Sequence, residues 1–507
     1  MNRTQRRAAA RSERHARTAR SVPHRRALAL GSAAVLAAAG ASTAVTLSAG
    51  VAGANAPIVV DSLADDGSGG TTLREAIDLA ETTPGQDTVS FSVTGTITLQ
   101  SDLPQINEAI HLVGPGSDLL TIDGDGHRVF YFYDVDESEG TLEISDLTIT
   151  GGGTNWAGGA IMVAYGNAPV VISGIVLSGN SPIGPGGGLA TYGQKGTLAL
   201  TDSQVSGNTA SNGGGLYFAT GSGRDIAVTV SDCEISGNTA SAGGGGISVN
   251  SGPVSLVVSS STVAGNTTDG LGGGIKLESL GSRAIVNSTI TANHAGNGGA
   301  VFTRHGLGIA QSTITGNTSA GNVGTFYLPT GGISVVQYDS PSPLGPVTSL
   351  PAPIYDGNLF ISGSIVTGND PSLGSPLDVA SFGTLASSHS VNVDADHSLL
   401  GTIGGNAALV DLGGTSTGVD VASLLLGPLG DNGGPTRTIP LGAGSPAIDA
   451  GPAAIVTFAG NEWDQRGDPW VRVHGSVVDV GAFENQPDPD PGPGPAPDPT
   501  PEPTFTG

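Results

Sequence analysis

The side chains best suited to binding a ligand recur at one place in a repeating pattern. They occupy alternate positions of the short apolar run that follows each of several glycine clusters. Aromatic side chains on a protein surface are typical of contact sites, because each ring supplies apolar area and tyrosine adds a hydroxyl. Charged residues at such positions either contact a ligand or form solvated ion pairs between strands. The candidate ligand-contacting residues are Tyr192, Tyr217, Lys276, Glu278, Phe302 and Arg304.

Catalysis on a polysaccharide would need acidic groups brought together. A Ca²⁺-dependent lyase needs several acidic ligands and a basic residue that takes a proton from the sugar, and a hydrolase needs two or three facing carboxylates. No pair of aspartates occurs at the outward positions described above. The acidic segments 123–126 and 134–139 would suit Ca²⁺, although they are more typical of a turn and a solvated loop. We therefore predict no catalytic residue, no metal ligand and no cofactor, with Ca²⁺ binding at these acidic segments as the alternative.

The elements that position these residues are repeats of about 28 residues. A segment similar to Ile-Ser-Gly-Asn ends at Asn180, Asn208, Asn238, Asn266, Asn293, Asn317 and Asn369. The residues ten, eight and three positions before each Asn are aliphatic, with Arg283 as the exception. Alternation of this kind predicts half-buried strands, and the residues six positions before each Asn are mostly bend formers. The segment 338–353 is predicted to be a loop inserted in the long last interval.

Each unit therefore holds three short strands, and the third follows the glycine cluster. Stacked coils pair each strand with its counterpart one coil on, and the repeated Asn side chains form an internal ladder of hydrogen bonds. Ankyrin-type and leucine-rich repeats do not fit, because no helical period runs through the unit, and a propeller blade needs four strands. The sequence predicts an all-β fold, a right-handed parallel β-helix with three-strand coils.

Further reactive side chains are assigned structural roles. His294 and His305 beside Arg304 form the densest basic spot, which is typical of a solvated surface. Asp449, Asp464 and Arg466 are predicted to form a buried hydrogen-bond network at the carboxyl end of the solenoid. The lone Cys233 lies at an inward position shared with Ser203, Ser261 and Ser288, and a single cysteine excludes internal disulfides.

Charge and the two termini indicate where the protein works. Residues 1–54 hold nine arginines in the first 26 positions and then an uncharged, Ala-rich stretch, which predicts a signal peptide cut after Ala54, with a membrane anchor as the alternative. Arg25-Arg26 allows a twin-arginine signal. Residues 55–507 carry ten Lys and Arg against 43 acidic residues, which excludes nucleic acid as a partner. Residues 486–507 are a Pro-rich, solvated spacer with no membrane segment, so we expect no transmembrane anchor in the mature chain.

A short amphipathic helix over 72–80, with Thr71 as N-cap, is predicted to cap the first coil. Residues 71–77 and 84–91 resemble the CSLREA domain of secreted bacterial β-helix proteins, with Thr71-Thr72 where that motif has Cys-Ser. The Asn and glycine units resemble polymorphic outer-membrane protein repeats, and 429–436, 444–451, 464–467 and 479–484 resemble a choice-of-anchor module. The resemblance implies a pectin-lyase-like fold and export, and little about activity.

The predicted organisation and function follow. Residues 57–140 form the amino-terminal cap and first coils, 141–370 the β-helix repeats, and 371–485 the last coils with the anchor-like module. We expect a secreted or cell-surface, non-catalytic protein that displays a long face for adhesion or for binding polysaccharides or cell-surface glycans. The alternative is a polysaccharide lyase of the pectate-lyase type or a hydrolase, and a purely structural role is the third hypothesis.

Overall fold

The computed structural model describes residues 56–83, 85–137, 140–221, 223–321, 330–337, 358–371, 377–383, 391–455, 460 and 462–487. Three predicted segments lie outside these residues: the signal peptide at 1–54, the inserted loop at 338–353, and all but the first two residues of the spacer at 486–507.

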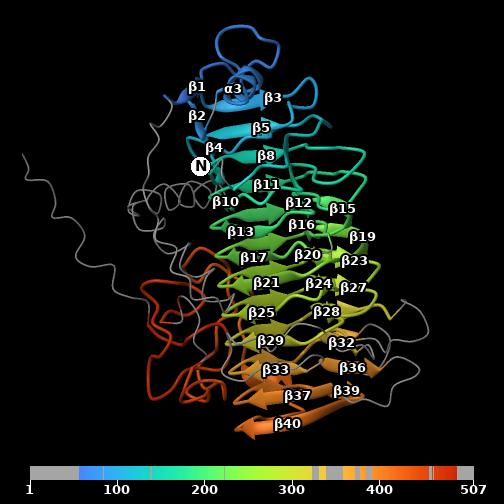
Figure 1. Ribbon diagram of the computed structural model, residues 1–507. Coiled ribbons are helices and arrows are strands. Elements are labelled where there is room, and N and C mark those ends of the chain that lie inside the picture. The colour runs from blue at the N-terminus through green and yellow to red at the C-terminus, as the bar shows by residue number, and fades with distance from the viewer. Residues whose placement is uncertain are drawn as a thin grey trace, which may run out of the picture.

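The chain folds as a right-handed parallel β-helix with coils of about 28 residues, as predicted (Figure 1). The longest sheet, sheet A, contains β1 (Ile58–Val60), β2 (Asp87–Phe91), β4 (Ile110–Val113), β7 (Leu142–Ser145), β10 (Val170–Ser173), β13 (Gly196–Thr201), β17 (Ile226–Ser231), β21 (Val254–Ser259), β25 (Arg283–Val286), β29 (Leu307–Ala310), β33 (Leu359–Ser362), β37 (Val391–Asp396) and β40 (Ala407–Gly413). Sheet B contains β3 (Gly95–Thr98), β5 (Leu120–Asp123), β8 (Thr148–Thr150), β11 (Val176–Ser178), β14 (Gln204–Ser206), β18 (Glu234–Ser236), β22 (Thr262–Ala264), β26 (Thr289–Thr291), β30 (Thr313–Thr315), β34 (Ile365–Val366) and β38 (Leu399–Leu400).

Two further sheets complete the coils. Sheet C contains β6 (Phe130–Tyr133), β9 (Ile161–Ala164), β12 (Leu189–Tyr192), β16 (Leu216–Phe218), β20 (Ile247–Val249), β24 (Ile275–Leu277), β28 (Val301–Thr303), β32 (Ile333–Gln337), β36 (Val379–Gly383) and β39 (Ile403–Gly405). Sheet D contains β15 (Thr209–Asn212), β19 (Thr239–Gly243), β23 (Thr267–Thr268), β27 (His294–Ala295), β31 (Thr318–Ser319) and β35 (Asp370–Pro371). Sheet D gives six coils a fourth short strand, which the prediction of three strands per coil missed.

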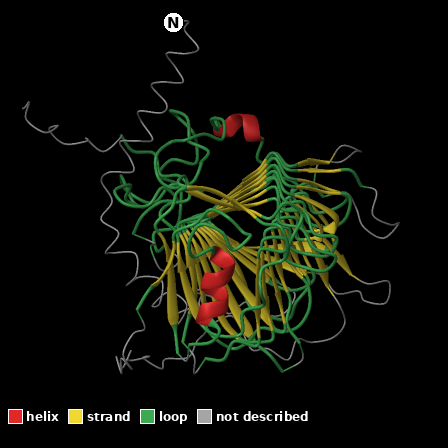
Figure 2. Cartoon of the chain, turned by 90° about the horizontal axis from the view of Figure 1, so that it is seen from above, coloured by secondary structure: helices red, strands yellow, loops and turns green. Residues whose placement is uncertain are grey.

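The predicted aliphatic columns form the interior. Val170 lies opposite Leu198 and Ile172 opposite Leu200 where β10 pairs with β13, and these side chains are buried in one continuous core. Seen from above, successive coils lie over one another around this core (Figure 2). Arg283, the exception in the pattern, is also buried, and its Nη1 donates to the carbonyl of Gly306 at 3.2 Å.

Two polar ladders follow the core. Each Asn of the repeat donates from Nδ2 to Oδ1 of the next Asn at 2.8–3.0 Å, which confirms the predicted ladder. The last amide, Asn369, donates to Asp378, an acceptor that the repeat did not predict. The second ladder lies at the inward position that Cys233 shares with Ser203, Ser261 and Ser288. There the backbone N–H of Cys233 donates to Ser261 Oγ at 3.1 Å. Cys233 is fully buried as predicted, and burial raises the pKa of its thiol.

A left-handed backbone turn joins sheets A and B. Its corner residue lies six positions before each Asn, or before Gly152 in the first unit, and has φ between 42° and 63°. These residues are Asp146, Gly174, Asp202, Asp232, Ser260, Asn287, Gln311 and Gly363. Short polar side chains and glycine tolerate this conformation best, which explains why the column holds bend formers.

The amino end is capped by helix α3 (Leu73–Ala80), which packs against β1 and β2. Thr72, and not Thr71 as predicted, is the N-cap. Its hydroxyl accepts the N–H of Glu75, while the Glu75 carboxylate accepts the N–H of Thr72 at 2.9 Å. This reciprocal arrangement satisfies two backbone donors that the first helical turn leaves free.

The carboxyl-terminal module, here residues 419–455 and 462–486, does not lie at the end of the solenoid as predicted. It runs back beside sheet B (orange and red in Figure 1), where Gln465 and Thr436 bond to residues of β22 and β26 and to the corner before β22. The module includes the short 3-10 helix η1 (Val421–Leu424). The outward hydroxyls of Thr262, Thr289 and Thr313 on sheet B each hydrogen bond to the module. None of the helices within the described residues has the length and apolar character needed to cross a bilayer.

Candidate functional site

The outer face of sheet C positions the candidate ligand-contacting residues in two columns. In the first column, Tyr131 lies opposite Met162, which is followed by Ala190 and then Tyr217 one strand further on. In the second column, Tyr133, Ala164 and Tyr192 lie on consecutive strands. Because strands of a sheet are about 4.8 Å apart, Tyr133 and Tyr192 stand roughly 10 Å apart with an alanine between them.

Five aromatic side chains on this face, the aromatic patch, form a closed ring of contacts. They are Tyr131, Tyr133, Trp156, Tyr165 and Tyr192. Neighbouring ring centroids lie 5.5–6.4 Å apart, and most of the pairs meet edge to face. Such geometry is favourable for aromatic pairs, so the rings stabilise one another in fixed orientations.

The patch faces solvent. Tyr133, Trp156, Tyr165 and Tyr192 are each between 36% and 43% exposed, and Tyr131 is partly buried, which raises its pKa. The floor between the rings is made of small buried side chains, Ala164 and Ala190. Contiguous exposed apolar surface of this kind marks an interaction site.

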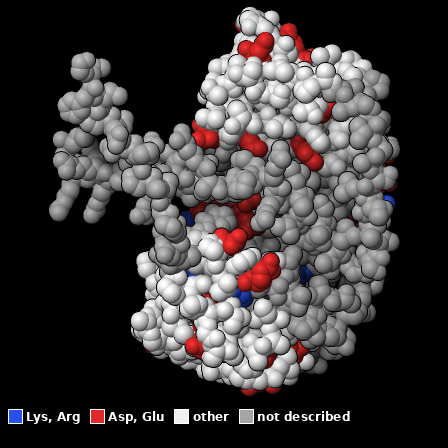
Figure 3. Space-filling model, turned by 90° about the vertical axis from the view of Figure 1, so that its left-hand side faces the viewer, with Lys and Arg blue, Asp and Glu red and all other residues white. Residues whose placement is uncertain are grey.

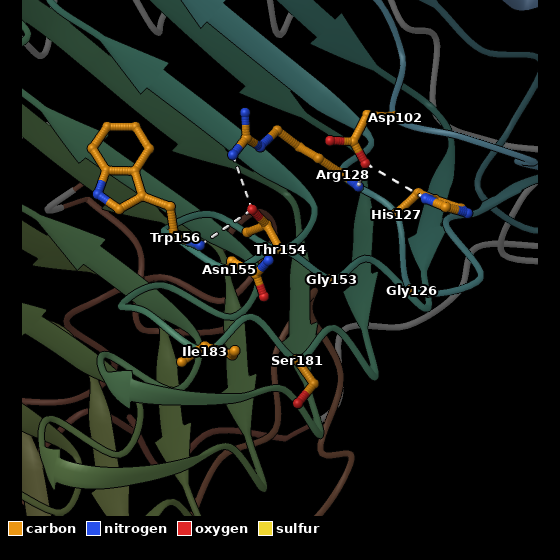
Figure 4. A pocket seen from close by; sticks show the side chains of 10 residues that line it. All are labelled: Asp102, Gly126, His127, Arg128, Gly153, Thr154, Asn155, Trp156, Ser181 and Ile183. Carbon is orange, nitrogen blue, oxygen red and sulfur yellow. Dashed lines mark hydrogen bonds and ion pairs between the residues drawn. The ribbon is translucent and has the colours of Figure 1, made fainter.

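A shallow hollow of roughly 620 Å³ adjoins the patch at Trp156 (Figure 4). It is lined by Asp102, Gly126, His127, Arg128, Gly153, Thr154, Asn155, Trp156, Ser181 and Ile183. The Arg128 guanidinium lies over the Tyr131 ring at 4.7 Å, and its Nη2 donates to Thr154 Oγ1 at 2.9 Å. His127 Nδ1 lies 3.6 Å from Asp102 Oδ1. The hollow therefore combines a cation, hydroxyl groups and an aromatic wall.

The three predicted aromatic residues differ in their exposure to solvent. Tyr192 is 43% exposed and belongs to the patch. Tyr217 is only 7% exposed, and its hydroxyl accepts Asn250 Nδ2 at 3.1 Å. Burial raises the pKa of Tyr217. The prediction that Phe302 is exposed is wrong, because Phe302 is fully buried against Val336, Leu377 and Ala380 from later coils.

The predicted charged residues lie together further along the same face. Glu278 Oε2 lies 2.6 Å from Lys276 Nζ, and its Oε1 lies 2.5 Å from Arg304 Nε. The Glu278–Arg304 pair joins neighbouring coils, as the sequence left open, whereas Lys276 and Glu278 are two residues apart in one coil. Lys276 is only 7% exposed, so its charge is held by Glu278 rather than presented to solvent.

Four members of the patch were not predicted from the sequence. Tyr131 and Tyr133 occupy alternate positions of Phe130–Tyr133, so their outward direction was readable from the strand period. Trp156 and Tyr165 lie in loops at either end of β9, and Tyr165 has a φ of 64°. No periodic signal marks loop residues of this kind, and only the folded backbone brings them to Tyr192.

The first acidic segment forms a turn. At 123–126, Asp123 Oδ1 accepts the N–H of Asp125 at 3.0 Å within a turn. Among the described residues, no three His, Cys, Asp or Glu side chains are grouped as metal ligands; Ser138 and Glu139 of the second segment lie outside them.

Asp464 and Arg466 form the predicted buried network. Their side chains are 2.6 Å apart, and Asp464 also accepts the N–H of Glu484. Burial raises the pKa of Glu484 to about 8. Asp449 lies at the exposed margin, where backbone N–H groups of Ser476 and Val477 lower its pKa.

Comparison with known proteins gives little further information. No family model matches the chain, and no curated protein matches it. A crystal structure of the pectate lyase Pel9A is similar at 14% sequence identity and a TM-score of 0.40, over 86% of this chain and 98% of that chain. A likeness of this size carries no inference about activity.

Proposed function

We propose that this protein is a secreted or cell-surface β-helix protein that binds glycans through the aromatic patch, without catalysing a reaction. The observation that carries the proposal is the closed ring of five aromatic side chains, four of them more than a third exposed. Burying such rings against a partner is favourable by about 25 cal/mol per Å² of apolar area. A sugar ring has an apolar C–H face, which stacks on an aromatic ring, and hydroxyl edges, which hydrogen bond.

The surroundings of the patch favour a sugar over an apolar ligand. Tyrosine hydroxyls border the rings, and Thr154, Asn155 and Ser181 line the adjoining hollow. These groups supply donors and acceptors at the rim of an apolar platform, which is the usual composition of a site for a small polar ligand. The platform also lies on strands and on turns that are bonded to them, so a ligand meets a largely preformed surface.

A lyase or hydrolase is less well supported. The two predicted cations of the sheet C face, Lys276 and Arg304, are both paired with Glu278. Lys276, Glu278 and Arg304 are therefore better suited to a structural role, in which the Glu278–Arg304 pair joins neighbouring coils.

The binding proposal is tested with Trp156→Ala and Tyr192→Ala, measured by affinity electrophoresis and by a glycan array. We expect each variant to lose at least about tenfold in affinity for any glycan that the wild type retains, because each removes exposed apolar area of the patch. Leu79→Ala is the matched control, since Leu79 is 52% exposed on helix α3 and distant in the fold. Unchanged binding in both patch variants would overturn the proposal.

The location is tested separately. Export of the full chain should yield a protein whose amino terminus is Asn55, which mass spectrometry detects directly. Retention of residues 1–54 in a membrane fraction would show instead that this segment anchors the chain.

A further inference from the structure

We infer that the glycan bound by the aromatic patch is acidic, with a carboxylate or sulfate group received by Arg128 in the adjoining hollow. This inference rests on the proposed function and adds the chemical class of the ligand. It starts from the positions of the cations, which are few in a chain with a net charge of −25.

Several cations far from the patch are matched by carboxylates of the chain, whereas the fully buried Arg472 donates to Asn287 and to the carbonyls of Gly481 and Ala482. Arg74 pairs with Asp65, Arg437 with Glu234, and Arg466 with Asp464, at 2.5–2.8 Å. Lys276 and Arg304 share Glu278. On the side of the molecule drawn in Figure 3, acidic side chains are prominent and basic ones few. In such a chain, a cation that borders a hollow and has no acidic partner is a candidate for binding an anion.

Arg128 is such a cation. Within the described part of the chain, it forms no ion pair, and its guanidinium is held by the Tyr131 ring and by Thr154 Oγ1. Its Nε is buried without a hydrogen-bond partner. Asp102, the acidic residue of the hollow, accepts the backbone N–H of Arg128 at 2.9 Å and lies beside His127. The guanidinium is therefore fixed in place while its charge lacks a carboxylate.

Two more cations border the patch on its other side. Arg224 Nη1 donates to the backbone carbonyls of Tyr165 and Gly193, at 2.5 and 2.8 Å, and Lys195 is exposed three residues after Tyr192. In the described residues, neither forms an ion pair, although Asp225 follows Arg224 in the sequence. Basic side chains thus lie on both sides of the rings, although Asp134, Asp136 and Glu137 follow Tyr133 on the side of Arg224. The cation of the hollow, Arg128, is therefore the one that favours an anionic group on the ligand.

The geometry indicates how one acidic sugar would bind. Figure 4 shows Arg128, Thr154 and Trp156 side by side along the rim of the hollow. An anionic group would accept hydrogen bonds from the guanidinium, and charge-assisted bonds of this kind are roughly twice as strong as neutral ones. The ring that carries the group, or its neighbour in the polymer, would stack on Trp156.

The test compares three polymers with one backbone: dextran, carboxymethyl dextran and dextran sulfate. Wild-type protein should bind at least one anionic polymer about tenfold or more tightly than dextran at low ionic strength, and this preference should shrink as salt is added. The two anionic polymers distinguish a carboxylate from a sulfate. Equal affinity for all three polymers would overturn the inference and leave the proposed function standing.

Arg128→Gln is the decisive variant, because glutamine retains a donor for Thr154 and loses the charge. We expect the preference for the anionic polymer to fall about tenfold or more while dextran binding is unchanged. Arg437→Gln, which removes an arginine beside sheet B, is the charge-matched control and should keep the preference. Trp156→Ala should weaken binding of all polymers alike. Failure of wild type to bind any of the three would overturn both the inference and the proposed function.

Discussion

Sheets B and C have the same interior construction and opposite outer faces. Both turn aliphatic residues inward in register, coil after coil. On sheet B the outer hydroxyls of Thr262, Thr289 and Thr313 are fully or almost fully buried, because the carboxyl-terminal module binds them. On sheet C the aromatic patch stays exposed. The same coil construction thus carries one outer face that is covered by the chain itself and one that is open to solvent.

The largest expected effect on the module that covers sheet B comes from removing its buried ion pair. Asp464→Ala leaves Arg466 buried without its carboxylate, and breaking a buried pair typically costs about 3–5 kcal/mol. We expect hydrogen exchange of residues 464–484 to accelerate strongly while the coils around Asn208 remain protected. Arg437→Ala breaks a partly exposed pair and should cost less than about 1 kcal/mol. Equal effects of the two variants would show that the module is not held by its interior.

Raising the pH should lower the stability of the same module. Glu484 has a folded pKa of about 8 against an ordinary 4.5, because burial disfavours its charged form. The folded state therefore holds a proton that the unfolded state releases, so the free energy of unfolding falls as pH rises from about 4.5 to about 8. Burial raises the pKa of neighbouring Asp479 and acts in the same direction.

This loss should be on the order of a few kcal/mol and confined to the module. Denaturation and hydrogen exchange at pH 5 and pH 9 measure it, and Glu484→Gln should flatten most of the dependence. Protection of 464–484 that rises toward pH 9 would contradict this assignment.

A smaller effect is expected where the module meets sheet B. Gln465 is fully buried and bonds to Thr289 Oγ1 at 2.6 Å and to Thr262 Oγ1 at 2.9 Å. Gln465→Leu leaves both hydroxyls buried without this partner, which costs about 1–3 kcal/mol in unfolding free energy. The double variant with Thr289→Val should recover part of the loss, since two apolar partners remove one unsatisfied group. If the losses of unfolding free energy were additive in the double variant, these side chains would not interact.

The two faces also differ in how far the sequence predicts them. The interior followed from the spacing of aliphatic residues and of Asn, since a period of two and a repeat of about 28 residues reflect local geometry. The outward residues were harder. Phe302 was expected to be exposed, but Val336 and Leu377, from later coils, cover it. Tyr192 was found, whereas Trp156 and Tyr165 reach the patch from loops, whose course depends on the whole coil. The module's position along sheet B depends on Gln465 meeting Thr262 and Thr289, a contact across about 200 residues that no local pattern encodes.

The smallest expected effect on stability is on the exposed face. Trp156→Ala and Tyr192→Ala remove side chains that are already about two-fifths exposed, although each contacts two neighbouring rings. Aromatic pairs contribute about 0.5–1.5 kcal/mol each, so we expect a loss of at most about 1–2 kcal/mol in unfolding free energy. Thermal denaturation of both variants, beside Gln465→Leu, provides the measurement.

Glycan binding should show the reverse order, strongly reduced in the patch variants and unchanged in Gln465→Leu. If Gln465→Leu also reduced glycan binding, the two faces would be coupled through the shared core, and the exposed patch would not be an independent site.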